Sequence, residues 1–341
     1  MTRILHAELA VAAQCELAEG PVWDPSRGLL WWVDILAGHV HSVDPVSGTR
    51  TRFDAGDPVG AVGLTRSGGL VLALVDGFAL ADHDGQRLTR VPGFSIDRSA
   101  LRFNDGKPDP WGNFWAGTMA WDETGNPPGS LYRLTPDGTV TELFGDVGLS
   151  NGLDWTDDRR IFYYADSTSG RVDLFETDPD TGALSGRRPF VTVPEAGGIP
   201  DGLTLDAEGC VWLAVWDSGE LRRFTPDGRL DTVVRLPARQ VTSAAFGGPD
   251  LGTLYITTAR QGYTDRDRRE QPHAGDIFAC TPGMPGRPPF LFAGLSRSTI
   301  ACCGLPHSPL IAGRAPGSVS AGGRGRDSRP APSAGPGPDR R

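Results

Sequence analysis

Four short motifs in the chain place an oxygen-bearing side chain directly before a glycine. They are Glu19-Gly20, Asn104-Asp105-Gly106, Asn151-Gly152 and Asp201-Gly202. A single Asn-Gly or Asp-Gly pair is usually no more than a turn. These four, however, stand at matching places, each just before the first strand of a repeated unit. We therefore interpret them as parts of one shared site.

The side chains of these motifs have the chemistry of a metal site. Glu19 and Asp201 supply carboxylates, and Asn104 and Asn151 supply amide oxygens. Two carboxylates and one amide oxygen suit a hard divalent cation, that is Ca²⁺, Mg²⁺, Mn²⁺ or Zn²⁺ with oxygen ligands. Without a cation, two carboxylates in a narrow channel repel each other and one tends to keep its proton. We therefore predict one bound divalent metal.

A repeated unit would position these motifs. It consists of a short apolar strand, an Asp/Gly turn and a strand rich in aromatic residues. Its six copies lie at residues 22–34, 62–73, 109–116, 152–165, 202–214 and 245–257. Their spacing of about 40 to 50 residues is the period of a propeller blade. A second marker, a strand ending in Thr-Pro-Asp-Gly, occurs at residues 131–138 and again at 221–228, so each unit supplies about four strands.

These observations predict an all-β fold, a six-bladed β-propeller with four-stranded blades. A β-sandwich is the alternative, but sandwiches lack so long a repeat. The first strand, around residues 9–17, is expected to complete the last blade. The propeller should occupy residues 1–294, and the Gly/Pro/Arg-rich tail at 295–341 has a disordered composition. Strands at equivalent places in different blades face the central channel, so the four motifs should converge there.

Composition excludes several other classes of protein. A formal net charge of -9 argues against binding to nucleic acid. No apolar run approaches the roughly 20 residues that span a bilayer, and we interpret the N-terminus as a strand and not as a signal peptide. The five cysteines are odd in number and unpaired in spacing, which indicates free thiols in a reducing, cytoplasmic compartment. Cys302-Cys303 lacks neighbouring ligands and is a poor metal site.

The sequence resembles the gluconolactonase, regucalcin (senescence marker protein) and luciferin-regenerating enzyme family. The matching pieces are residues 19–23, 102–107 with 116–119, 129–132, 150–153 and 200–203. The likeness runs from about residue 16 to 294. It implies a six-bladed propeller with one catalytic divalent metal held by Glu19, Asn151 and Asp201.

The resemblance also implies substrate contacts. It assigns sugar-lactone contacts to Arg102 and Asn104, and by counting from Met119 it places a further acidic contact on Asp122. The neighbouring Trp121 departs from the family pattern, in which a polar residue is common.

Two functions follow as hypotheses. The first is a metal-dependent hydrolase, a lactonase that opens a sugar-acid lactone to the aldonic acid. There the metal polarises the carbonyl, Asp201 takes a proton from water, and Arg102 grips hydroxyl groups. The second is a calcium-binding regulatory or scaffold propeller without turnover. A phosphotriesterase-like propeller would share the metal but would not need Arg102. We expect a monomer or a small homo-oligomer.

Other catalytic classes are disfavoured. A serine esterase is a weak alternative, because the one Gly-x-Ser-x-Gly match, at residues 148–152, leads into an expected strand and not into the strand-to-helix elbow that such enzymes use. The histidines show no metal-binding spacing, and we expect them all at the surface: His6, His39, His41, His83, His273 and His307.

Overall fold

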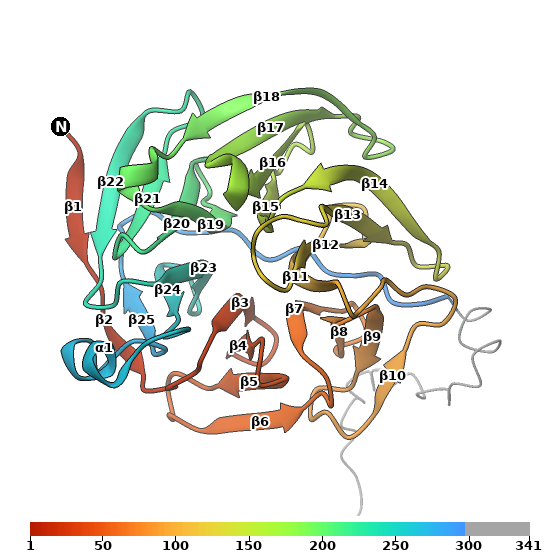
Figure 1. Ribbon diagram of the computed structural model, residues 1–341, viewed down its shortest axis with the longest axis horizontal. Helices are drawn as coiled ribbons and strands as arrows, with labels where there is room; N and C mark the ends of the chain where they lie inside the picture. The colour runs from red at the N-terminus through yellow and green to blue at the C-terminus, as the bar shows by residue number, and fades with distance from the viewer. Residues whose placement is uncertain (297–341) are drawn as a thin grey trace, which may run out of the picture. The chain divides into compact units, whose positions relative to one another are not determined.

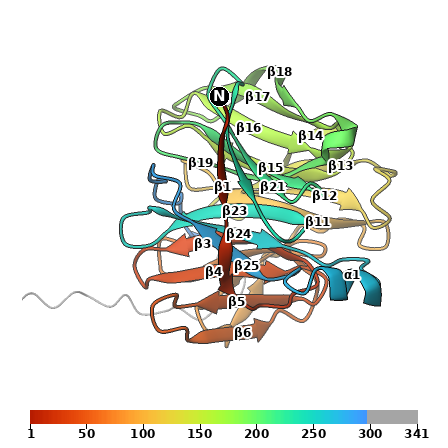
Figure 2. The same ribbon diagram turned by 90° about the vertical axis from the view of Figure 1, so that its left-hand side faces the viewer.

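Six sheets stand around a central channel in a computed structural model that describes residues 1–296 of the chain (Figure 1). Five sheets have four strands and one has five. The side view shows the sheets as blades stacked around the ring (Figure 2). The predicted six-bladed β-propeller is therefore confirmed, with six blades in the six places that the repeat indicated.

Each blade begins at the channel and proceeds outwards strand by strand. The first three blades contain β3 (Ala18–Asp24), β4 (Leu29–Asp34), β5 (His39–Val43) and β6 (Arg50–Asp54); β7 (Val59–Leu64), β8 (Leu70–Leu74), β9 (Phe78–Ala81) and β10 (Leu88–Arg90); and β11 (Leu101–Pro108), β12 (Phe114–Ala120), β13 (Gly129–Leu134) and β14 (Val140–Val147). The next two contain β15 (Ser150–Trp155), β16 (Ile161–Asp166), β17 (Arg171–Thr177) and β18 (Leu184–Thr192); and β19 (Ile199–Leu205), β20 (Val211–Trp216), β21 (Glu220–Phe224) and β22 (Leu230–Arg235).

The last blade closes the ring. It contains β23 (Val241–Gly247), β24 (Thr253–Thr258), β25 (Ile277–Cys280) and, from the N-terminus, β2 (Glu8–Val11). β2 pairs antiparallel with β25, so an N-terminal strand completes the last blade as expected, although it ends well before residue 17. A further strand, β1 (Arg3–His6), was not anticipated and pairs parallel with β22 of the preceding blade.

Helix is scarce in the described residues. The one α-helix is α1 (Asp265–Glu270), whose N-cap residue Thr264 forms a capping box with Asp267. Two short 3-10 helices, η1 (Ser167–Ser169) and η2 (Glu195–Gly197), precede β17 and β19. No helix in this part of the chain is long and apolar enough to cross a membrane.

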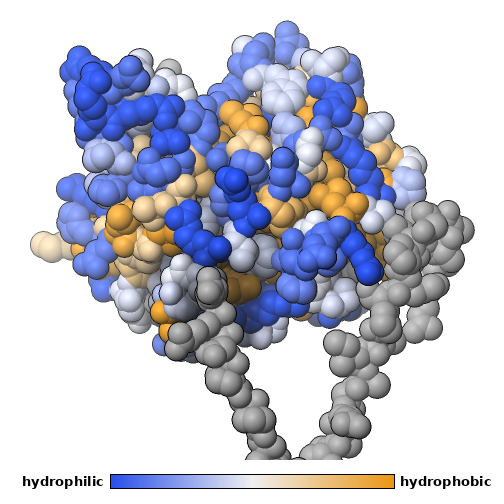
Figure 3. All heavy atoms as spheres, turned by 90° about the horizontal axis from the view of Figure 1, so that it is seen from below, coloured by the Kyte–Doolittle hydropathy of each residue, from blue (hydrophilic) through white to orange (hydrophobic). Residues whose placement is uncertain are grey.

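The apolar core lies within and between the blades. Trp115 of the third blade meets Trp155 of the fourth edge-on, with ring centroids 4.9 Å apart. The indole of Trp115 also donates a 2.7 Å hydrogen bond to Asp109, and Trp212 repeats this contact with Asp206 at 2.9 Å. These pairs explain why an aspartate precedes the tryptophan in both units. Outside the core, the face seen in Figure 3 is mainly hydrophilic, with apolar side chains in separate patches.

One surface prediction is wrong. His41 is buried, because β5 places it opposite Trp32 and its ring stacks on the indole with centroids 5.1 Å apart. His307, Cys302 and Cys303 lie outside the described residues.

The other three cysteines, Cys15, Cys210 and Cys280, are free thiols, as expected.

All six innermost strands carry a β-bulge near their first residues. In β3 the register shifts between Glu19 and Val22, and in β15 it shifts between Ser150 and Leu153. The remaining four shift at the equivalent place: β7, β11, β19 and β23. A bulge re-aims the side chains around it. The motifs noted in the sequence lie at these bulges, so they are strand irregularities at the channel and not turns.

The glycines of these motifs allow the inner strands to approach closely. A Cβ on Gly152 would lie 2.5 Å from the backbone nitrogen of Leu203 and 2.7 Å from the carbonyl oxygen of Asp201. Since both neighbouring atoms belong to backbone, they cannot move aside. The glycine of Asn151-Gly152 therefore sets the distance between β15 and β19.

After β25 the chain crosses the ring, as the blue segment in Figure 1 shows. Gly286 bridges to Asp206 and Phe292 bridges to Thr65. Phe292 is fully buried. We call residues 285–293 the strap. The proposed domain end at residue 294 stays a prediction, and residues 297–341 lie outside the described part of the chain.

The close approach at Gly152 gives a first prediction. Gly152→Ala should lower the free energy of unfolding by about 1–3 kcal/mol, the usual cost of overpacking, because the added methyl meets backbone. Chemical denaturation would measure it. Gly197→Ala is the matched control, since its Cβ would meet nothing nearer than 3.6 Å, and it should change stability by less than about 0.5 kcal/mol. Equal effects of the two substitutions would contradict the proposed packing role.

Candidate functional site

Five of the six side chains singled out in the sequence meet in one pocket. The pocket has a volume of about 80 Å³ and opens where the inner strands begin. The five are supplied by four different blades and are all buried: Glu19, Arg102, Asn104, Asn151 and Asp201. Because the inner strands all begin at the same end of the channel, residues near their starts converge although they lie up to 182 positions apart.

The amide of Asn151 is held in a defined orientation. Its Nδ2 donates to Ser167 Oγ at 2.9 Å, and Ser167 in turn donates to the Pro200 carbonyl at 2.6 Å. The Oδ1 of Asn151 accepts a longer bond of 3.3 Å from Asn104 Nδ2. Since the nitrogen is turned towards Ser167, the amide oxygen remains on the side of the pocket. Asn151 can therefore offer an oxygen ligand.

Arg102 and Asn104 form a second fixed pair. Arg102 Nη1 donates to Asn104 Oδ1 at 2.7 Å and to the Phe103 carbonyl at 3.1 Å. Asn104 Nδ2 donates to the Ser150 carbonyl at 2.9 Å. The Nε and Nη2 atoms of Arg102 make no hydrogen bond to the residues that the structure describes, so these donors are available to a ligand. The guanidinium of Arg102 also lies over the ring of Trp121, with its Cζ atom 5.8 Å from the ring centroid.

Burial and like charges disfavour the ionised forms of the carboxylates in the channel. Burial, together with the charge of Asp105, raises the pKa of Glu19 to about 8. Burial and the charges of Glu19 and Asp105 raise the pKa of Asp201 well above its usual range. Burial lowers the pKa of Arg102 to about 10, against the charges of Glu123, Glu19 and Asp201. A bound cation would relieve this repulsion, because it favours the ionised form of nearby carboxylates.

The predicted acidic contact lies differently. Asp122 is exposed, and its carboxylate accepts bonds from the backbone and hydroxyl of Thr124 at 3.1 and 2.8 Å. The next residue, Glu123, lines the pocket, and its Oε1 accepts a 2.8 Å bond from Gln261. Glu123 has a φ of 61°, so the chain turns sharply there. The structure therefore directs the carboxylate of Glu123, and not that of Asp122, towards Arg102.

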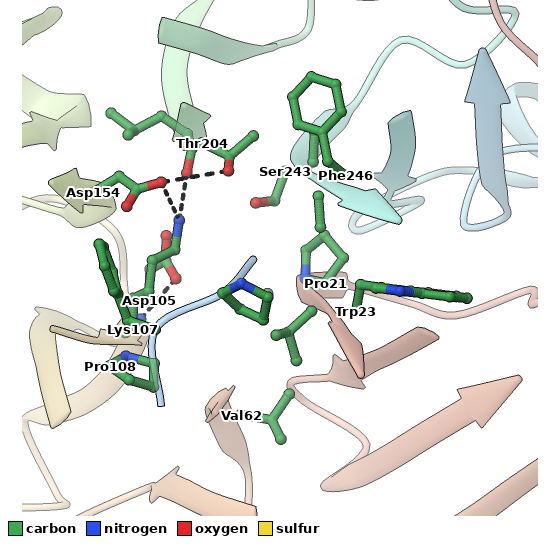
Figure 4. Close-up of a pocket in the computed structure, with 18 of the residues that line it drawn as sticks. Pro21, Trp23, Val62, Asp105, Lys107, Pro108, Asp154, Thr204, Ser243 and Phe246 are labelled. Carbon is green, nitrogen blue, oxygen red and sulfur yellow. Dashed lines mark hydrogen bonds and ion pairs between the residues drawn. The ribbon is translucent and has the colours of Figure 1, made fainter. Parts of the chain in front are cut away.

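A second cavity continues the channel beyond the pocket. It has a volume of about 60 Å³, and Asp105 and Lys107 line it together with residues of the strap. Figure 4 shows Lys107 extending towards Asp154. Its Nζ donates to Asp154 Oδ2 at 3.1 Å and to the Leu203 carbonyl at 3.0 Å. Asp154 also pairs with Arg287 of the strap. The only lysine of the chain thus belongs to a charge network below the site.

Several residues of the site escaped sequence reasoning. Asp105 lies within a recognised motif but received no role, and burial raises its pKa to about 6 while the charge of Lys107 opposes that shift. Glu123 and Gln261 come from loops, and Ser167 from η1. For Asp105 and Lys107 the signal was present in their motif; for the loop residues no spacing or composition marks them.

The chain is similar to proteins of one known family. The chain matches the SMP-30/Gluconolactonase/LRE-like region over residues 17–260. Regucalcin from Xenopus laevis is 38% identical over 296 residues, covering 85% of this chain and 99% of that protein. A 6-deoxy-6-sulfogluconolactonase from Pseudomonas putida is 38% identical over 280 residues, covering 82% and 95%.

The fold is also similar to a solved structure. A calcium-binding regucalcin from Agrobacterium tumefaciens matches with a TM-score of 0.79 and 30% identity, covering 86% of this chain and 99% of that one.

The repulsion between the buried carboxylates gives a second prediction. In metal-free protein the folded state holds a proton on Glu19 that the unfolded chain releases at lower pH, so stability should fall as pH rises from about 5 to about 8. Glu19→Gln removes one charge and should flatten this decline. Each pKa unit corresponds to about 1.4 kcal/mol, so we expect the variant to be at least about 1 kcal/mol more stable at the upper pH.

Thermal unfolding in the presence of a chelator would measure the effect. Glu142→Gln is the control, because Glu142 is exposed and should leave the pH dependence unchanged. Added divalent metal should stabilise the parent protein more than Glu19→Gln. Parallel pH profiles for the parent and Glu19→Gln would show that Glu19 is not under charge strain.

Proposed function

The chain belongs to the SMP-30/gluconolactonase/LRE-like family, and from this we propose that it is a metal-dependent lactonase that opens a sugar-acid lactone to the aldonic acid. The observation that carries the proposal is the convergence of Glu19, Asn151 and Asp201 beside Arg102 in one buried pocket. Hydrolysis of a lactone needs a polarised carbonyl, a deprotonated water and donors that hold the ring, and these side chains can serve all three needs.

The residues fit a divalent cation. Burial raises the pKa of both Glu19 and Asp201, the charge of Glu19 raises that of Asp201 further, and the oriented amide oxygen of Asn151 lies with them in the same pocket. We propose Glu19, Asn151 and Asp201 as the ligands. This all-oxygen set suits Ca²⁺, Mg²⁺, Mn²⁺ or oxygen-bound Zn²⁺. When bound, such a cation supplies Lewis-acid polarisation of the carbonyl and a lowered pKa for water.

Asp201 is the proposed general base. Its carboxylate is buried in the pocket, and β19 holds it immediately before the bulge glycine, Gly202. A carboxylate in this position can accept the proton of the attacking water and later deliver it to the leaving ring oxygen. Of the acidic side chains that line the pocket, only Asp201 and Glu19 are buried.

Arg102, Asn104 and Glu123 are the proposed substrate contacts. The unused Nε and Nη2 donors of Arg102 can hold a hydroxyl or carboxylate group. Its position between the buried carboxylates and the ring of Trp121 fixes the direction of those donors. Glu123 lies at the loop side of the pocket, where it can accept hydrogen bonds from sugar hydroxyl groups. These contacts favour a small polyhydroxylated substrate.

A calcium-binding propeller without turnover is the second candidate function. It is favoured by the regucalcin relatives and by the description of the Agrobacterium tumefaciens protein as calcium-binding. The two candidates share the metal ligands and differ in the use of Arg102 and Glu123, which a cation site alone does not need.

A panel of aldonolactones would test the proposal. We expect turnover that a chelator abolishes and a divalent metal restores. Asp201→Asn keeps an oxygen of similar shape but loses the proton acceptor, so turnover should fall by roughly a hundredfold or more even at saturating metal. Tight Ca²⁺ binding with no hydrolysis of any lactone would favour the regulatory function. Full recovery of Asp201→Asn at high metal would make Asp201 a ligand only.

The geometry around Arg102 gives a further prediction. Glu123→Gln should raise KM for the lactone several-fold with a smaller effect on kcat, because the lost charge faces the substrate side of the pocket. Asp122→Asn is the matched control, since Asp122 is exposed and bound to Thr124. Steady-state kinetics on both variants decide which carboxylate contacts substrate: the reverse result would assign the contact to Asp122.

A further inference from the structure

A second group of ligand-type side chains lies away from the pocket. Atoms of Cys15, Asp34 and His41 that can bind a metal lie within 4.8 Å of one another. All three residues are buried, with 2%, 6% and 8% of their surfaces exposed. None of them lines the pocket described above.

The three residues meet where the ring closes. Asp34 ends β4 and His41 lies in β5, both in the first blade. Cys15 lies between β2 of the last blade and β3 of the first, and its backbone nitrogen donates to the Gly275 carbonyl at 2.9 Å. The cluster therefore joins the N-terminal segment, the first blade and the last blade, a region that can be followed in Figure 1 between β2, β4 and β5.

Hydrogen bonding leaves part of this cluster unsatisfied. The Nε2 atom of His41 is buried and has no hydrogen-bond partner among the described residues. The carboxylate of Asp34 accepts bonds from the backbone nitrogens of Glu16 and Leu17, at 3.1 and 3.0 Å. No described cation forms an ion pair with Asp34. A buried imidazole without a partner is costly, and a buried carboxylate normally has a counter-charge.

A similar cluster in the fifth blade shows the contrast. Asp206, Glu208 and Cys210 also bring three ligand atoms together. There, Arg223 occupies the position of a cation: it pairs with Asp206 at 2.7 Å and with Glu208 at 2.5 Å. The protein thus neutralises that cluster itself, and we assign no metal to it. The cluster at the ring closure has no such arginine.

We propose that Cys15, Asp34 and His41 form a second metal site, specific for Zn²⁺, that fastens the closure of the propeller. One thiolate, one carboxylate and one imidazole are ligands that Zn²⁺ accepts, with water or a further group in the fourth tetrahedral position. Sulfur and nitrogen ligands discriminate against Ca²⁺ and Mg²⁺, which prefer oxygen. The two sites of the protein would therefore select different ions.

Metal bound at this site would stabilise the folded protein and would take no part in the hydrolysis of the lactone. Cys15 precedes β3, and a bond from its sulfur to an ion shared with β4 and β5 ties the N-terminal segment to the first blade. Binding requires the Cys15 thiol to release its proton, and burial together with Asp34 raises the pKa of that thiol to about 12 in the absence of metal. Affinity should consequently weaken in acid. An ion that binds only the folded state raises its stability.

Titration with Co²⁺, a spectroscopic substitute for Zn²⁺, would test the proposal. The full chain should carry Cys302→Ser and Cys303→Ser, so that the two thiols outside the described residues cannot contribute. A thiolate-to-cobalt charge-transfer band should appear at one equivalent and disappear on addition of Zn²⁺. Because the oxygen ligands of the pocket cannot give this band, Glu19→Gln should leave it unchanged.

Substitutions then identify the ligands. Cys15→Ala should abolish the band, and Cys280→Ala, a matched change of a partly buried thiol elsewhere, should retain it. His41→Gln keeps Cys15 in place and should weaken Co²⁺ binding at least tenfold, which keeps the test decisive if Cys15→Ala does not fold. Zn²⁺ should raise the Tm of the parent chain more than that of His41→Gln. Absence of the band in the folded parent, or its persistence in Cys15→Ala, would overturn the proposal.

Discussion

Like charge confined in the channel is the constraint on which the rest of the structure depends. Glu19, Asp105 and Asp201 are all buried there, and burial raises the pKa of each. The charge of Asp105 adds to this effect at Glu19 and Asp201, and the charge of Glu19 adds to it at Asp201. Removing a carboxylate from water costs several kcal/mol unless it is paired. The cations that oppose this cost are Arg102 on the pocket side and Lys107 below. Arg102 is itself desolvated, so its attraction only partly offsets the repulsion and leaves the pocket favourable to a further positive charge.

The propeller makes such an arrangement possible without mobile loops. Each inner strand begins at the same end of the channel, and each carries a bulge close to that end. The site residues of four blades therefore point into the pocket from a backbone that neighbouring blades hold on both sides. Gly152 lets β15 and β19 come close enough for Asn151 and Asp201 to share the pocket. The residues at the edge, Glu123 and Gln261, come instead from connecting loops, where changes of substrate can occur without disturbing the metal ligands.

The fold could be predicted from the sequence because the regular spacing of the repeated units indicates the blades. The convergence of Glu19, Asn151 and Asp201 could also be predicted, because equivalent positions in a repeat must face the same axis. Sequence reasoning failed where a local backbone event decides. A bulge adds a residue without altering composition, and spacing does not reveal that Glu123, a residue with a positive φ, lines the pocket. His41 was expected at the surface because a lone histidine carries no sign of its cross-strand neighbour, Trp32.

The strap completes the electrostatics of the site from the far side. Arg287 stacks on Phe290, with its guanidinium carbon 4.6 Å from the ring centroid, and pairs with Asp154. Asp154 is thereby ionised, with burial opposed by the charges of Arg287 and Lys107, and its pKa lies below the usual range. An ionised Asp154 holds the ammonium of Lys107 next to Asp105. Arg287 lies on a segment that follows the last blade. Its charge thus helps to fix the position of Lys107, whose own charge offsets that of Asp105 next to the pocket. The strap is in this sense part of the site, although none of its residues lines the pocket itself.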